Sequence, residues 1–184
     1  MHLTNLFACL ALCVCAAGIS ADDTDAEAKA YFEKNLGKLV TVKPKLLKDA
    51  AIAKVLTAKI YRVELGVGDT TLTPLIGRDG EKIVTLTQPS TNQDVPGLKA
   101  IVDPKFKLTT ETDAIVFQSV LDALYPISNT FGEDDLKAKT IRHNGTEWTF
   151  VRGKFFKKDK GFMVTTDKDG VITKVRFSLE LADK

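Results

Sequence analysis

The chain has 184 residues, a formal net charge of +2, 44% hydrophobic residues and 27% charged residues. These values are typical of a soluble globular protein that forms one ordinary domain or two small ones. The small net charge favours no class of partner, and the absence of cysteine after Cys15 excludes a disulfide framework from the rest of the chain.

The first 21 residues are predicted to be a secretory signal peptide. Leu3 to Ile19 contains no charged residue, small residues follow, and the acidic pair Asp22-Asp23 comes next. The apolar run is too short and too close to the terminus to span a membrane comfortably, so no transmembrane segment is expected after cleavage. We expect cleavage between Gly18 and Ala21 and export to the periplasm or the exterior.

All three cysteines lie inside this predicted signal peptide. A lipoprotein is the less favoured alternative, because the lipidated cysteine needs a small residue before it. Cys13 and Cys15 follow Leu12 and Val14, and Cys9 comes too early. The mature chain is therefore expected to fold without disulfides, held together by its hydrophobic core.

Residues 22–93 are predicted to form a unit of one long helix followed by hairpins. Helices are expected over residues 25–38, after a Thr24 capping box, and over residues 49–56, with Asp49 as N-cap. Strands are expected over residues 40–42, 58–65, 72–76 and 82–87, with a turn at 77–80. Pro44 should stop the first strand, because proline cannot donate a ladder hydrogen bond.

Residues 94–184 are predicted to form a second unit of the same kind, after a polar linker at 88–93. Asp94 is expected to cap a short helix that begins with Pro96. A longer amphipathic helix should start after Thr109 or Thr110 and end at Pro126, followed by an acidic loop at 128–136. The two units can also form one compact domain.

The C-terminal segment, residues 139–181, has the clearest pattern in the chain. Apolar and polar residues alternate from Val171 to Leu181, which is typical of a half-buried strand. Turn signals precede it at Asn144-Gly145, at 159–161 and at Asp169-Gly170. The segment is therefore predicted to be a four-stranded antiparallel meander.

The sequence predicts an α+β fold in which amphipathic helices pack on antiparallel sheet. Its outline resembles the helix-on-sheet architecture of cystatin-like folds, although no residue motif ties the chain to a named family. Phe32, Leu36 and Leu39 share the spacing of Phe117, Leu121 and Leu124. An old duplication of a helix-then-hairpins unit would explain this repeat, but two unrelated amphipathic helices would share it as well.

Little in the sequence indicates catalysis, a metal or a cofactor. After the predicted signal peptide the chain has one histidine, His143, and no cysteine, which is too few for an ordinary zinc site or nucleophilic triad. The acidic runs, including Glu133-Asp134-Asp135, are typical of solvated loops. No glycine-rich phosphate loop is present, so neither a metal nor a cofactor is expected.

Charge is unevenly distributed in the second unit. Residues 137–184 hold twelve Lys or Arg against six Asp or Glu, whereas residues 109–136 hold none against six. Basic residues surround aromatic ones in the meander, and this pattern suggests a binding surface, although aromatic strand residues more often form core. The candidate residues are Tyr61, Trp148, Phe150, Arg152, Lys154, Lys157 and Lys158. Strand alternation places Thr146, Trp148, Phe150 and Arg152 on one face of a strand, and function is expected first on this face.

Three functional hypotheses follow. The first is an exported, non-enzymatic module that binds an exported protein or an anionic polymer through its sheet; nucleic acid is not expected as a partner. The second is a small-molecule carrier or sensor with an apolar pocket between helix and sheet. The third, least favoured, is a hydrolase that uses dispersed carboxylates.

Overall fold

The fold was analysed in a computed structural model, which describes residues 25–36, 41–67, 70–89, 91–126, 139–155 and 157–181. The predicted signal peptide, its three cysteines, the Thr24 cap and the acidic loop at 128–136 lie outside the described residues.

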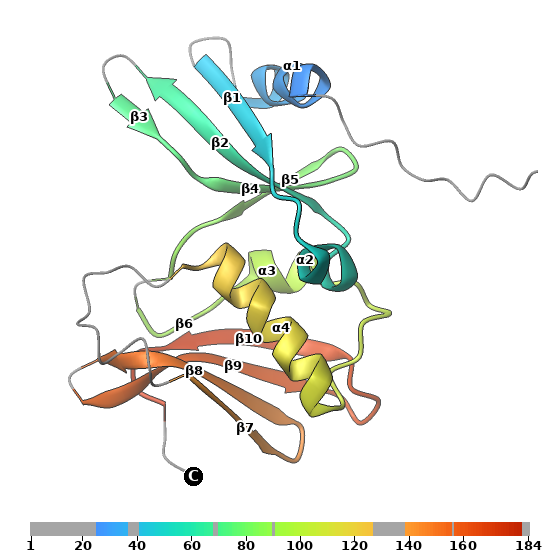
Figure 1. Cartoon of the computed structure of the whole chain (residues 1–184), viewed down its shortest axis with the longest axis vertical. Helices are drawn as coiled ribbons and strands as arrows, with labels where there is room; N and C mark the ends of the chain where they lie inside the picture. The colour runs from blue at the N-terminus through green and yellow to red at the C-terminus, as the bar shows by residue number, and fades with distance from the viewer. Residues whose placement is uncertain are drawn as a thin grey trace, which may run out of the picture.

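The described residues form an α+β structure with two antiparallel sheets (Figure 1). The helices are α1 (Asp25–Leu36), α2 (Ala50–Val55), α3 (Pro96–Ile101) and α4 (Glu111–Leu124). The N-terminal sheet has the order β1-β2-β4-β5, with β3 paired to β2. Its strands are β1 (Thr41–Leu46), β2 (Lys59–Val67), β3 (Thr70–Leu72), β4 (Leu75–Asp79) and β5 (Lys82–Leu86).

The C-terminal sheet has the order β6-β10-β9-β8-β7 and contains the predicted meander. Its strands are β6 (Gln93–Asp94), β7 (Thr140–Asn144), β8 (Glu147–Phe155), β9 (Lys158–Thr166) and β10 (Ile172–Ser178). The prediction of an α+β fold with helices on antiparallel sheet is confirmed, and so are the four strands of the meander.

Helix α1 packs on the N-terminal sheet and closes a small core there. Ala28, Tyr31 and Phe32 recur at helical spacing, so they lie on one face of α1 and are buried. Phe32 meets Tyr61 of β2 edge to face, with ring centroids 5.3 Å apart. This cluster is separate from the main core of the molecule.

Pro44 and Gly77 lie inside strands of the N-terminal sheet, where the sequence predicted a strand end and a turn. Pro44 lies inside β1, paired with Val63, and does not end the strand. Among the described strands β1 pairs only with β2, and an edge strand tolerates a residue without an N–H donor. Gly77 lies within β4, so the hairpin turn begins only at Gly80, whose φ is +57°.

The predicted Asp94 helix cap was wrong, and the predicted linker at 88–93 ends one residue earlier, because Gln93 begins β6. Asp94 belongs to β6 and pairs with Arg176 of β10, so the end of the supposed linker is part of the C-terminal sheet. Val95 donates a backbone hydrogen bond of 2.8 Å to Val175 and occupies the N-cap position of α3 without a side-chain cap. Pro96 still opens the helix, as expected.

Helix α4 confirms its predicted capping. The Thr110 hydroxyl accepts from the Asp113 N–H at 3.2 Å, and the Asp113 carboxylate accepts from the Thr110 N–H at 3.0 Å. In the meander, Gly145 (φ +61°) and Gly170 (φ +79°) occupy turns, as predicted. The middle turn is displaced: it lies between Phe155 and Lys158, and residues 159–161 belong to β9.

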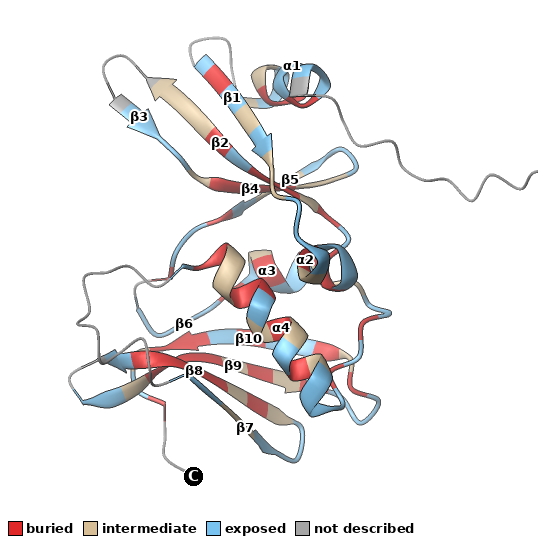
Figure 2. Cartoon of the chain, viewed as in Figure 1, coloured by how far each residue is buried: buried red, intermediate tan, exposed pale blue. Residues whose placement is uncertain are grey.

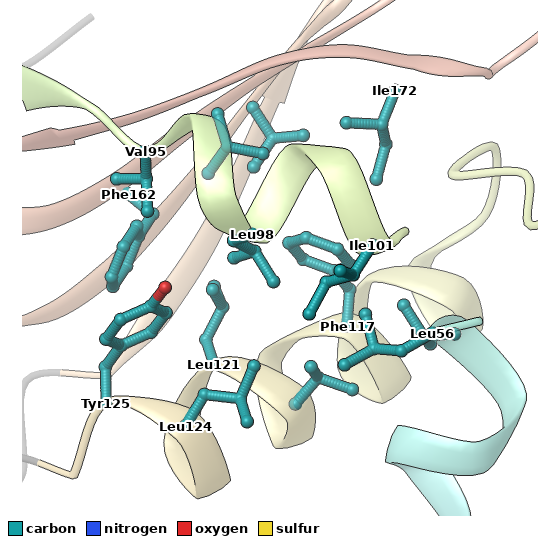
Figure 3. Close-up of a cluster of buried hydrophobic side chains, with 14 of the residues drawn as sticks. Leu56, Val95, Leu98, Ile101, Phe117, Leu121, Leu124, Tyr125, Phe162 and Ile172 are labelled. Carbon is teal, nitrogen blue, oxygen red and sulfur yellow. The ribbon is translucent and has the colours of Figure 1, made fainter. Parts of the chain in front are cut away.

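The main core lies between α4 and the C-terminal sheet and extends to α2, α3 and part of the N-terminal sheet. Leu98 and Ile101 of α3 meet Phe117, Leu121 and Leu124 of α4 (Figure 3). Ile60, Leu75 and Leu86 of the N-terminal sheet belong to the same cluster. Buried residues are accordingly concentrated where the helices face the sheets (Figure 2). None of the described helices has the length and apolar character needed to cross a membrane.

Candidate functional site

The seven predicted binding residues do not form one surface. Tyr61 is 1% exposed in the small core under α1. Trp148 and Phe150 are buried on the face of β8 that meets α4, together with Arg152. Only Lys154, Lys157 and Lys158 are exposed. Trp148, Phe150 and Arg152 share the face on which the sequence predicted function. In the structure, that face of β8 is packed against α4.

Arg152 lies beneath the last turn of α4. Its Nη1 donates to the Leu121 carbonyl at 2.9 Å, and its Nη2 lies 2.7 Å from Asp122 Oδ1. The guanidinium also sits 5.9 Å from the centroid of the Phe162 ring. The last turn of α4 contains no basic residue. Arg152 of β8 thus supplies the positive charge that stabilises the carbonyl end of that helix.

Burial shapes the ionisation of this region. Desolvation lowers the pKa of Arg152, although the Asp122 carboxylate raises it in part. Desolvation raises the pKa of the neighbouring helix-end residue Tyr125 well above its usual range. The Tyr125 hydroxyl and Arg152 Nε are buried and have no hydrogen-bond partner among the described residues. Both residues are buried, and neither lines any of the three clefts described below.

The opposite face of the C-terminal sheet carries no described helix (Figure 1). The strand register aligns one residue from each strand across this face: Arg142 of β7, Thr149 of β8, Met163 of β9, Arg176 of β10 and Asp94 of β6. We call these five residues the helix-free row. Because side chains alternate along a strand, the buried partners Trp148, Phe150, Phe162 and Val175 point the other way.

A cleft of about 310 Å³ opens on this face at the β7 end of the row. Its lining comes from three adjacent strands and from the C-terminal segment, where Leu181 is buried. Leu181 is held in place by its N–H, which donates to the Asp159 carbonyl at 2.7 Å. The lining residues are Arg142, His143, Asn144, Glu147, Thr149, Met163 and Leu181.

Ion pairs neutralise much of the charge on this face. Arg142 pairs with Asp159, and Lys174 lies 3.2 Å from Asp94. The cleft therefore combines neutralised charges with the apolar Met163 and Leu181 and the polar Thr149 and Asn144. Such a mixture is typical of surfaces that bind protein segments.

His143 is explained by local structure. Its ring stacks on Trp148 at 3.8 Å between centroids and 12° between planes. Its Nε2 lies 2.7 Å from the Gly145 carbonyl, so it supports the β7–β8 turn. Within the described ranges, the ring makes no hydrogen bond to a hydroxyl or a carboxylate of the kind that a catalytic triad uses.

The exposed lysines gather at the β8–β9 turn. Lys158 pairs with Glu180 at 2.7 Å. Within the part of the chain that the structure describes, Lys154 and Lys157 make no hydrogen bond or ion pair. Lys157 also has a φ of +68°, which places it in the left-handed region at the tip of the hairpin.

Two further clefts lie away from the C-terminal sheet. One of about 410 Å³ is lined by Lys54, Asp103, Lys105, Phe106, Lys107, Thr109 and Asp113. The other, of about 610 Å³, surrounds α2. No group of three or more metal-ligating side chains comes together in the described ranges. The acidic run at 133–135 lies outside those ranges.

Comparison with protein-family models, with curated protein sequences and with solved structures found no match. The geometry of the surface therefore carries the functional argument.

The helix-free row combines residues that sequence reasoning had not selected. Thr149, Met163 and Arg176 are unremarkable in sequence, and they become neighbours only through the register of three strands, β8 to β10. The predicted alternation in β8 and β10 identified which residues share a face, but it could not show which face α4 covers.

Proposed function

We propose that the chain is an exported, non-enzymatic binding module whose partner is an extended segment of another exported protein. The observation that carries the proposal is the helix-free row, which crosses the C-terminal sheet beside a cleft of about 310 Å³. Antiparallel sheets tolerate one solvated face, so exposure alone would mean little. A cleft with apolar and polar lining on that face adds a reason to expect a ligand.

The charges favour a protein segment over a polyanion at this site. Of the cations in the row, Arg142 is paired with Asp159, while Arg176 is exposed opposite Asp94. A polyanion binds by displacing counterions from many unneutralised cations, and such an excess is missing here. Met163 and Leu181 offer apolar contact, which an apolar protein side chain can use and the phosphate or sulfate groups of a polyanion cannot.

A peptide-display selection on the immobilised, purified chain tests this function. Selected peptides should bind the wild type, and Thr149→Arg or Met163→Arg should weaken binding at least about tenfold by filling the cleft. Leu72→Arg is the matched control, because Leu72 is exposed on β3 of the other sheet. Peptides that bind all three variants as well as the wild type would show that the site lies elsewhere.

An anionic polymer is the second candidate partner, and the β8–β9 turn favours it. Lys154 and Lys157 project there without a partner among the described residues. Dextran sulfate is a suitable probe. If this candidate holds, Lys154→Glu together with Lys157→Glu should weaken its binding and flatten its salt dependence, whereas Thr149→Arg should not weaken it. The anionic polymer would be eliminated as a partner if the wild type does not bind dextran sulfate while Thr149→Arg and Met163→Arg lose peptide binding.

A further inference from the structure

The cleft of about 410 Å³ lies apart from the helix-free row and shares no lining residue with the other two clefts. Its lining comes from the last turn of α2, from the segment that connects α3 to α4, and from the first turn of α4 (Figure 1). The volume falls in the range of sites for small ligands. Nothing in the function proposed for the C-terminal sheet uses this region.

Three lysines, Lys54, Lys105 and Lys107, line this cleft, and all three are exposed. We call it the three-lysine cleft. Among the described residues, none of their ammonium groups makes a hydrogen bond or an ion pair. Their charges therefore repel one another with no carboxylate at ion-pair distance to compensate. An anion bound in the cleft would replace this repulsion with attraction.

The two carboxylates of the lining are held by backbone and capping hydrogen bonds. Asp103 Oδ1 accepts from the Lys105 N–H at 2.8 Å and closes a local turn. Asp113 Oδ2 accepts from the Thr110 hydroxyl at 2.7 Å and from the Thr110 N–H at 3.0 Å, as part of the α4 capping box. Neither carboxylate forms an ion pair with a lysine of the cleft in the part of the chain that the structure describes, so the three ammonium groups stay available to a ligand.

Packing fixes the backbone of the segment that carries two of these lysines. Phe106, which lies between them in sequence, is buried, and its ring stacks on Phe117 at 6.1 Å between centroids. The Asp103 N–H donates to the last carbonyl of α2 at 2.8 Å, and the Leu108 N–H donates to a carbonyl of the β9–β10 turn at 2.9 Å. A ligand therefore does not have to order this segment, which lowers the entropic cost of binding.

We propose that the three-lysine cleft binds a compact anion that carries two or more phosphate groups, with Lys54, Lys105 and Lys107 as its cationic contacts. The ammonium group of lysine is a compact charge with three donors and is a common partner of phosphate. A ligand with a single charge would neutralise one lysine and leave the other two in mutual repulsion, so the site favours a polyvalent anion. The binding step is non-covalent.

Isothermal titration of the purified chain with sodium tripolyphosphate, in about 0.15 M NaCl, tests the assignment. We expect saturable one-to-one binding that is at least about tenfold tighter than that of orthophosphate or citrate. Tripolyphosphate can contact all three ammonium groups, whereas orthophosphate is too small and citrate presents planar carboxylates that suit arginine better. Absence of saturable binding, or an affinity for orthophosphate or citrate that equals that for tripolyphosphate, would overturn the proposal.

Two triple variants of equal net charge locate the site. The combination of Lys54→Gln, Lys105→Gln and Lys107→Gln should lower the affinity for tripolyphosphate at least about tenfold. The matched control replaces three exposed lysines that line none of the three clefts: Lys45→Gln, Lys82→Gln and Lys99→Gln. Circular dichroism confirms that both variants are folded.

The control should keep the wild-type affinity. Equal losses in the two triple variants would show that affinity follows net charge alone, and unchanged affinity in the cleft variant would place the anion elsewhere. Either result would overturn the proposal. Thr149→Arg, which tests the helix-free row, should not weaken tripolyphosphate binding, so failure at one site is distinguishable from failure at the other.

Discussion

At the scale of single residues, Arg152 is where the structure changes the interpretation most. Its position in a basic and aromatic strand suggested a binding residue, but it is 4% exposed and holds the end of α4. Strand alternation correctly placed it beside Trp148 and Phe150. The sequence could not show that the last turn of α4 would lie above that face, because the contact joins segments about thirty residues apart.

Arg152→Leu should lower the free energy of unfolding by about 2–3 kcal/mol. The substitution leaves the Leu121 carbonyl without its guanidinium donor and removes the Asp122 ion pair. Urea unfolding followed by Trp148 fluorescence measures the change. Lys154→Leu, two residues away and exposed, should stay within about 0.5 kcal/mol of wild type. Equal effects of the two substitutions would contradict the role given to Arg152.

Gly161 is a second residue whose importance only the structure shows. It lies in β9 opposite Val151, where β8 has a bulge, and a Cβ there would come within 2.0 Å of the Phe150 carbonyl oxygen. Gly161→Ala should therefore destabilise the fold by about 1–3 kcal/mol. Gly66→Ala is the comparison, since its Cβ would meet Thr41 at an ordinary 3.4 Å. If thermal unfolding gives Gly66→Ala a lower melting temperature than Gly161→Ala, this account of the bulge is refuted.

At the scale of elements, local signals predicted well and long-range ones did not. The Thr110 cap, the Asp49 cap and the turns at Gly80, Gly145 and Gly170 depend on neighbours within a few residues, and all of them are present. The turn expected at 159–161 is the exception, because it lies earlier in the chain. The effect of Pro44 depended on whether β1 is an edge strand, and the partner of Asp94 is 82 residues away in β10. Neither fact is encoded in a local pattern.

The α4 capping box makes stability depend on pH. Burial raises the pKa of Asp113, but hydrogen bonds from Thr110 and Thr109 outweigh it, so the pKa is lower than in an unfolded chain. The carboxylate therefore stabilises the fold above its unfolded pKa of 3.8, and this contribution is lost as the pH falls through the folded pKa. When the pH falls from about 5 to about 3, the free energy of unfolding should therefore decrease less for Asp113→Asn than for the wild type. Urea unfolding at both pH values measures the difference.

Thr110→Ala tests the same cap from its other side. Removal of the hydroxyl that accepts from the Asp113 N–H should lower stability by about 1 kcal/mol. Ser119→Ala, in the middle of α4 and exposed, removes only a hydroxyl that bonds back to Ile115 and should be neutral or slightly stabilising. If Thr110→Ala leaves the free energy of unfolding in urea unchanged, the capping box does not stabilise the fold.

At the scale of the whole molecule, one core joins helices α2 to α4 with both sheets. Ile60 of the N-terminal sheet belongs to the same cluster as Phe117 and Trp148. Ile60→Ala should therefore lower the free energy of unfolding by about 2–5 kcal/mol. The unfolding transition should shift equally when it is followed by Trp148 fluorescence and by far-UV circular dichroism. Fluorescence that is unaffected while circular dichroism shifts would mean that the two sheets unfold separately.

The candidate site, like the core, depends on contacts between distant segments that local sequence patterns do not specify. The α+β class and the four strands of the meander could be predicted from alternation and turns, because those signals lie within the segment. The helix-free row required the register of β7 to β10 and the knowledge that α4 covers the other face. The three-lysine cleft required α2, residues 103–109 and α4 to come together, which no single segment specifies.

Site-specific photo-crosslinking in cells that produce the chain tests the proposed function most directly. A photoreactive residue placed at Thr149 or Met163 on the helix-free row is compared with one at Ile115, which is exposed on the outer side of α4. The account predicts one discrete protein adduct from both row positions and none from Ile115. Adducts from Ile115 alone, the same adducts from all three positions, or none at the row would contradict it.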